Sequence, residues 1–139
     1  MSFDKAAYGR REPVSFRLTL ENTGREALWV NTRFHLNSRE ASIEDREVAL
    51  VIISPSSRIL PCKFSDTTGL PRSDDFVLVE PGQSVASAGG QDLRTYADLP
   101  EPGTYQIVAL YDNIFGDELE IPAFRGTLAS EPVKFEIAP

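Results

Sequence analysis

The chain has 139 residues, of which 41% are hydrophobic and 25% are charged. These values are ordinary for a globular protein and exclude a disordered chain, and the length fits a single domain spanning residues 1–139. The net charge is −7, and residues 98–139 carry −6 of it, from eight acidic and two basic side chains. Because nucleic acid binds to basic surfaces, this balance argues against nucleic acid as a partner.

Targeting and covalent features are sparse. Cys62 is the only cysteine, so no internal disulfide can form, and we expect a buried thiol. The N-terminal residues lack the apolar core of a signal peptide, and the longest apolar run, residues 48–53, is far shorter than the ~20 residues of a membrane span. We therefore expect no membrane insertion. Only fold analogy bears on the compartment, and it favours an extracytoplasmic one.

Apolar residues alternate with polar ones along most of the chain. In residues 14–20, for example, Val14, Phe16 and Leu18 alternate with Ser15 and Arg17, which is the period of a half-buried strand. Further strands are predicted over residues 26–36, 47–54, 58–64, 75–80, 84–88, 93–99, 105–111 and 133–137. No amphipathic helix is predicted. Short strands separated by frequent turn signals indicate an antiparallel β-sandwich of about 7–9 strands.

Residues 99–113, LPEPGTYQIVALYDN, form the clearest local pattern. Pro100 and Pro102 end the preceding strand because proline donates no ladder hydrogen bond, and Gly103 provides the positive φ that a turn requires. Both faces of the next strand are largely apolar, which predicts a central position in a sheet. Tyr105, just inside this corner, is predicted to anchor it structurally, with its ring in the core and its hydroxyl on nearby backbone.

Two segments, ENTG (21–24) and PGTYQIVALY (102–111), resemble the corresponding segments of bacterial immunoglobulin-like domains. The resemblance implies an immunoglobulin-like β-sandwich. The chain departs from antibody domains because it has no cysteine pair on which Trp29 could stack. ENTG, LVEPG (78–82) and EPGTY (101–105) also resemble the BsuPI-type intracellular proteinase inhibitor domain. That resemblance implies inhibition of a proteinase but assigns no inhibitory residue.

Catalytic patterns are missing from the sequence. His35 is the only histidine, and nothing in the sequence brings Cys62 or a serine to it. One histidine and one cysteine cannot supply the four ligands of a structural zinc site, and no phosphate-binding glycine motif is present. We therefore expect a protein that is not an enzyme, with no catalytic residue, no bound metal and no cofactor.

The connection between the last two predicted strands, residues 112–131, is much longer than the 2–5 residues of an ordinary hairpin loop. Three interpretations stay open. Its apolar residues fold back as a lid or lengthen the hairpin, its aromatic residues form an exposed recognition surface, or its carboxylates bind calcium. The candidate binding residues are Phe115, Asp117, Glu118, Glu120, Phe124 and Arg125.

The sequence thus predicts a non-catalytic binding or interaction module that uses the end loops of a β-sandwich, with a protein as its partner. A loop-based proteinase inhibitor is one alternative. The other is a calcium-dependent carbohydrate-binding domain or an accessory domain of a hydrolase. The oligomeric state stays open.

Overall fold

The computed structural model describes residues 1–139 and confirms the all-β class, with twelve strands, one four-residue helix and three 3-10 turns. The strands are β1 (Ser2–Phe3), β2 (Ala7–Tyr8), β3 (Ser15–Arg17), β4 (Thr19–Glu21), β5 (Leu28–Asn31), β6 (Val48–Ile53), β7 (Phe76–Val79), β8 (Ser84–Ala86), β9 (Gln91–Asp92), β10 (Gly103–Asn113), β11 (Gly126–Ala129) and β12 (Val133–Ile137). Helix α1 spans Leu93–Tyr96, and η1, η2 and η3 span Ile43–Asp45, Ser73–Asp75 and Asp117–Leu119.

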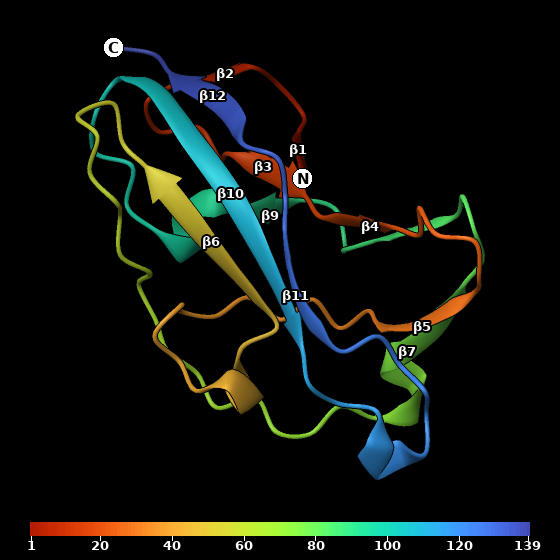
Figure 1. Cartoon of the computed structure of the whole chain (residues 1–139). Helices are drawn as coiled ribbons and strands as arrows, with labels where there is room; N and C mark the ends of the chain where they lie inside the picture. The colour runs from red at the N-terminus through yellow and green to blue at the C-terminus, as the bar shows by residue number, and fades with distance from the viewer.

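Strand β10 is the centre of the first layer (Figure 1). One of its edges pairs antiparallel with β6, and the other pairs with β12 and then with β11. Strand β2 adds to β12 in parallel. Gly103, the first residue of β10, has a φ of 121°, in the positive range that the sequence predicted. The central position predicted from the two apolar faces of this strand is confirmed.

A bulge separates β11 from β12. Ile107 pairs with Val133 and Leu110 pairs with Ala129, so β12 and β11 have one residue more than β10 between these two pairs. Ser130 lies in this interval, where its hydroxyl accepts a hydrogen bond from the Ala109 backbone N–H at 2.9 Å. The serine side chain thus replaces a backbone acceptor where the regular ladder is interrupted.

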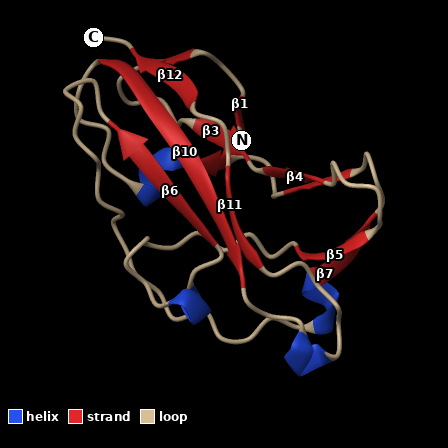
Figure 2. Ribbon diagram, viewed as in Figure 1, coloured by secondary structure: helices blue, strands red, loops and turns tan.

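The second layer contains the ribbons β1–β3–β9, β4–β8 and β5–β7 (Figure 2). The β4–β8 and β5–β7 ribbons meet at a corner formed by residues 22–27 and 80–83. Asn22 is buried at this corner, and its amide donates to the Val79 and Glu26 carbonyls at 2.9 and 2.8 Å. The ENTG turn of the sequence is therefore a corner between two ribbons.

The core lies between the two layers and includes eighteen buried residues drawn from both of them. Tyr105 is fully buried and stacks on Phe135 at 5.2 Å between ring centroids. Its hydroxyl donates to the Glu101 carbonyl at 2.8 Å and accepts from the Glu101 N–H at 2.9 Å. These contacts connect the Pro-Glu-Pro-Gly turn to the start of β10.

Several sequence-based predictions of local structure are wrong. Residues 93–99 contain helix α1, because Asp92 caps it by accepting from the Arg94 N–H and because Leu93 and Tyr96 bury one helical face. Residues 58–64 form no strand and make only one isolated bridge, at Ile59, since Pro61 donates no ladder hydrogen bond.

Other differences concern single positions. His35 lies outside β5, beside Phe34, whose φ of 49° is incompatible with a strand. Cys62 is half-buried and not buried. The predicted strand over residues 14–20 is divided into β3 and β4 at Leu18, which is one reason why the strand count exceeds the predicted 7–9. The chain has no helix with the length and apolar character needed to cross a membrane.

Candidate functional site

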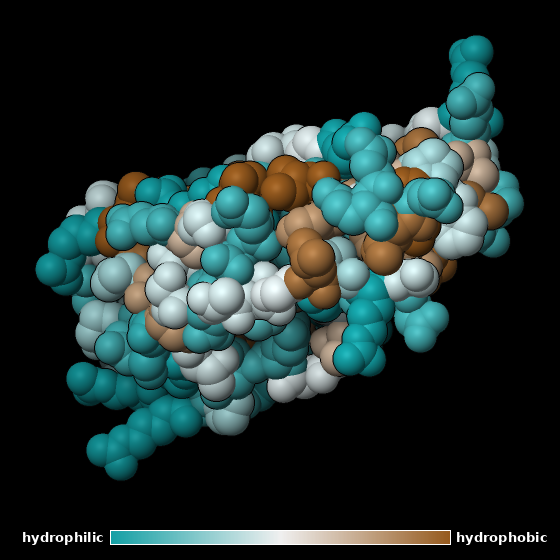
Figure 3. Space-filling view, turned by 90° about the horizontal axis from the view of Figure 1, so that it is seen from below, coloured by the Kyte–Doolittle hydropathy of each residue, from teal (hydrophilic) through white to brown (hydrophobic).

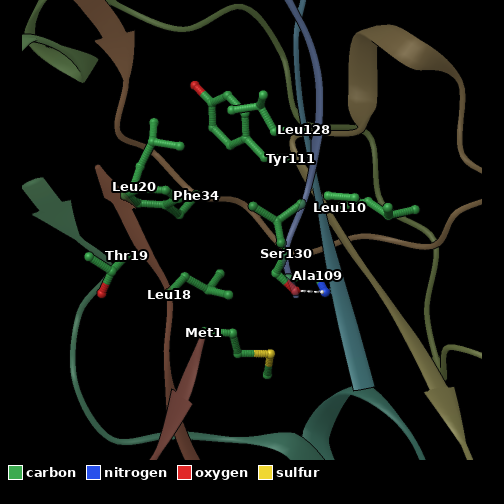
Figure 4. Close-up of a pocket in the computed structure, with 12 residues that line it drawn as sticks. Met1, Leu18, Thr19, Leu20, Phe34, Ala109, Leu110, Tyr111, Leu128 and Ser130 are labelled. Atoms are coloured by element: carbon green, nitrogen blue, oxygen red, sulfur yellow. Dashed lines mark hydrogen bonds between the residues drawn. The ribbon is translucent and has the colours of Figure 1, made fainter. Parts of the chain in front are cut away.

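An apolar groove lies between β4 of the second layer and β11 of the first. It consists of two adjoining cavities of about 230 and 190 Å³. Leu20 and Leu128 line both cavities, so they stand where the two meet. Ten of the twelve residues that line the larger cavity are hydrophobic. We refer to the two cavities together as the edge groove, and Figure 4 shows the residues of the larger one.

The floor of the edge groove is built from aromatic residues. Phe34 and Tyr111 line the larger cavity with their ring centroids 6.1 Å apart. Phe124, which is half-buried and lines the smaller cavity, stacks on Tyr111 at 6.5 Å. The Tyr111 hydroxyl donates to the Asn31 carbonyl at 2.8 Å. Because that hydroxyl is already engaged, the floor offers mainly apolar contact.

The β4 edge of the groove has unpaired backbone groups. β4 pairs with β8 alone, and Leu18 and Asn22 direct their backbone groups toward that partner, as the Ser87–Leu18 and Asn22–Gln83 hydrogen bonds show. Backbone groups alternate in direction along a strand. The N–H and C=O groups of Thr19 and Glu21, between these residues, therefore point away from β8 and along the groove.

The β11 edge on the other side of the groove has the same property. β11 pairs only with β10, and Ser130 directs its N–H to the Ala109 carbonyl. By the same alternation, Thr127 and Ala129 direct their backbone groups away from β10. All four residues of β11 are exposed. Two unpaired strand edges thus flank the apolar floor, an arrangement that readily accepts another strand.

The N-terminal segment pairs with strands that adjoin both edges. β1 pairs with β3, the strand that precedes β4, and β2 pairs with β12, the strand that follows β11. Met1 lines the larger cavity (Figure 4). Neither β1 nor β2 pairs with β4 or β11, whose outward edges line the groove.

Leu128 is 40% exposed and Leu20 is half-buried, although both belong to the groove. Glu21 is the only charged side chain among the residues that line the two cavities. The site is therefore apolar, with one negative charge at the end of β4 that is nearest the ribbon corner.

The end loop, residues 114–125, carries the six binding residues predicted from the sequence. Phe115 is buried, with 5% of its surface exposed, and the Phe124 N–H donates to the Trp29 carbonyl at 2.8 Å. The Asn113 amide donates to the Phe115 and Phe124 carbonyls at 2.8 and 2.7 Å. Gly116 has a φ of 151°, and a Cβ there would lie 2.7 Å from the Ile121 carbonyl oxygen. These contacts favour the interpretation in which the loop folds back onto the layers.

The charged residues of the end loop are exposed and do not converge. Asp117 pairs with Arg125 at 2.6 Å, Glu118 accepts from the Gly116 N–H at 3.0 Å, and Glu120 ends η3 in a left-handed conformation. Nowhere in the chain do three or more His, Cys, Asp or Glu side chains form a group that could hold a metal ion.

The buried carboxylates of the molecule are engaged in structural contacts. Glu47 accepts from Arg33 at 2.5 Å and from the Asn31 amide at 2.7 Å. Burial raises the pKa of Glu47, and the hydrogen bond and charge of Arg33, with the Asn31 amide, act in the opposite direction. Asp112 accepts from Arg46 at 3.0 Å. Glu47 immediately precedes β6 and Asp112 lies near the C-terminal end of β10, so both carboxylates connect these strands to neighbouring segments.

The surface at the end-loop side of the molecule is mixed in character. Figure 3 shows hydrophobic groups interspersed among hydrophilic ones on this face. The exposed large hydrophobic residues that do not line the groove are Ile43, Ile59, Leu70, Val77, Leu78 and Ile114. They come from separate elements and loops, whereas the groove gathers its apolar residues around one space.

Comparison of the chain with protein-family models, with curated proteins and with solved structures found no match.

Sequence reasoning did not identify the edge groove. The apolar residues of LTLE (18–21) and GTLA (126–129) carry the alternation of half-buried strands, which was the available signal. That signal does not reveal which strand edges stay unpaired, because pairing depends on where the N-terminal segment lies. Of the predicted binding residues, Phe124 alone borders the groove.

Proposed function

We propose that this chain is a non-catalytic protein-binding module that takes part of its partner into the edge groove. The observation that carries the proposal is the apolar space of about 230 and 190 Å³ between two strand edges whose outward backbone groups have no partner. Apolar cavities with a few polar groups at their rim are the usual form of a binding site.

We also propose that the two layers form an immunoglobulin-like sandwich. The support lies in the shared N-terminal segment, which contributes β1 to one layer and β2, in parallel, to the other. The hydrogen bonds between the Tyr105 hydroxyl and Glu101, four residues upstream, resemble a tyrosine corner. Because folds of this kind host many functions, the binding proposal depends on the groove and not on the fold.

The end loop enters this proposal mainly as a wall of the groove. Its buried Phe115 is not accessible to a partner, whereas Phe124 lines the smaller cavity. The exposed residues Asp117, Glu118 and Arg125 would contact only the flanks of a bound partner.

Site-directed photocrosslinking in the native host tests the proposal. A photoreactive phenylalanine analogue replaces Leu128 in the groove or, as the control, Ile59, which is 58% exposed near the β6 edge. We expect a discrete crosslinked partner from position 128, absent from position 59 and lost when Leu20→Arg is added. If both positions capture the same proteins, or if Leu20→Arg has no effect, the groove is not the binding site.

A further inference from the structure

We propose that the partner contributes an extended segment that adds to β4 as an antiparallel strand, with apolar residues at alternate positions and a basic residue facing Glu21. This inference rests on the proposed function and specifies the chemistry and the register of the bound segment. Peptides recognised by strand addition gain affinity from backbone hydrogen bonds and specificity from pockets for alternate side chains.

The register follows from the strand that already occupies the neighbouring part of the same edge. Ser2 pairs with Arg17 and Phe3 pairs with Phe16. Continued by one residue, this register places Met1 opposite Leu18, and both residues line the larger cavity. A segment in line with β1 would next face Thr19, then Leu20, then Glu21.

The backbone groups on this edge are suited to such a segment. Ser15, Arg17, Thr19 and Glu21 are alternate residues, so their backbone groups point to the same side. In the part of this edge that pairs with β1, the Ser15 carbonyl accepts a hydrogen bond from the Asp4 N–H. The β4 part of the edge thus presents donors and acceptors with the spacing that β1 already uses. Burial of the groove by a partner that could not pair with them would leave these groups unsatisfied, at a cost.

The side chains of the added strand alternate between the groove and solvent. Directly opposed residues in an antiparallel pair share a face, so a residue that faces Leu20 would point into the groove, as Met1 does opposite Leu18. The residue that faces Asn22, two positions away, would point toward the smaller cavity, which Asn22 lines. The two cavities therefore select two apolar side chains at alternate positions.

Charge favours a different protein over a second copy of this chain. Glu21 is the only charged side chain that lines the groove. In a second copy, neither β4 (Thr19–Glu21) nor β11 (Gly126–Ala129) contains a basic residue that could face it. A basic residue opposite Glu21 would instead form a favourable cross-strand pair.

A short N-terminal extension tests the register directly. The extension Val-Lys-Val-Thr, placed before Met1, puts valines opposite Asn22 and Leu20 and the lysine opposite Glu21. The matched control, Lys-Val-Thr-Val, has the same composition shifted by one position, which turns its apolar residues out of the groove. Because the extension is covalently linked, its effective concentration at the groove is high.

We expect the in-register extension to raise the melting temperature by about 3 °C or more and to slow amide hydrogen exchange at Thr19 and Glu21 by about tenfold or more. The shifted extension should do neither. The in-register extension should also block crosslinking of the partner from position 128.

Two results would overturn the inference. If the two extensions behave alike, strand addition in this register is wrong, although crosslinking from position 128 in the unextended chain would still support the proposed function. If the unextended chain crosslinks to a second copy of itself from position 128, the occupant is not a different protein. Failure of the proposed function is recognised separately, because the unextended chain would then give no specific crosslink from position 128.

Discussion

At the scale of single residues, short polar side chains complete the hydrogen bonding at three places where strands are interrupted. The Ser87 hydroxyl accepts from the Leu18 N–H at 2.9 Å between β3 and β4, and the Ser130 hydroxyl accepts from the Ala109 N–H at the bulge. Asn22 does the same for the carbonyls at the ribbon corner. Buried backbone groups need such partners, so each interruption depends on one polar residue.

Glu47 gives rise to a pH-dependent prediction at this scale. Its pKa is raised in the folded protein by burial, and the Arg33 and Asn31 contacts oppose that shift only in part. The unfolded chain therefore releases this proton at lower pH than the folded chain does. The contribution of Glu47 to stability is greatest below its unfolded pKa of about 4.3 and decreases as the pH rises toward the folded value.

The test compares Glu47→Gln with the unsubstituted chain by urea unfolding at a series of pH values from about 4 to 8. We expect the stability of the unsubstituted chain, relative to the variant, to fall as the pH rises through this range. Titrating groups that do not interact with residue 47 contribute equally to both proteins and cancel in the difference. A difference that stays constant, or that grows with pH, would contradict the raised pKa.

At the scale of elements, the end loop is a packed connection that continues the β10–β11 hairpin. β10 extends to Asn113 and β11 begins at Gly126, so the irregular part is shorter than the sequence indicated. The Asn113 amide donates to the carbonyls of Phe115 and Phe124, which lie at the two ends of the irregular segment. The Phe115 side chain is buried. The loop thereby supports Phe124 at the wall of the edge groove.

Removal of the Phe115 ring should test this packing. We expect Phe115→Ala to lower the free energy of unfolding by about 3–5 kcal/mol, because a buried phenylalanine leaves a cavity when it is truncated. Ile114→Ala is the matched control, since Ile114 is 38% exposed, and it should cost less than about 1 kcal/mol. The midpoints of urea unfolding measure both. Equal small effects would show that the loop is not packed and would restore it as an exposed recognition surface.

The elements differ in how well the sequence predicts them. β10 and its corner are predictable because proline, glycine and two apolar faces act locally on the same residues. Helix α1 was missed because its four residues are too few to show a helical period, and it depends on a cap from Asp92. The edge groove was missed for a different reason: it depends on which strands β1 and β2 pair with, and strand pairing over long sequence separations is not encoded in any local pattern.

At the scale of the whole molecule, unpaired strand edges and net charge act against each other. Exposed edges promote association between copies, whereas the charge of −7 keeps copies apart. This repulsion disappears near the isoelectric point of about 4.7. The balance between the two effects therefore depends on pH, and it can be measured without knowledge of the partner.

We expect the chain to self-associate reversibly as the pH approaches about 4.7 and to do so through the uncovered β11 edge. Ala129→Lys places a positive charge on that edge, and Thr104→Lys makes the same change of net charge at an exposed residue of β10, outside the groove. Sedimentation velocity should show markedly less association for Ala129→Lys than for Thr104→Lys, each measured at its own isoelectric point. If the two variants associate equally, net charge alone controls association. That result would contradict association through the β11 edge, because a charge at the edge would act no differently from a charge elsewhere on the surface.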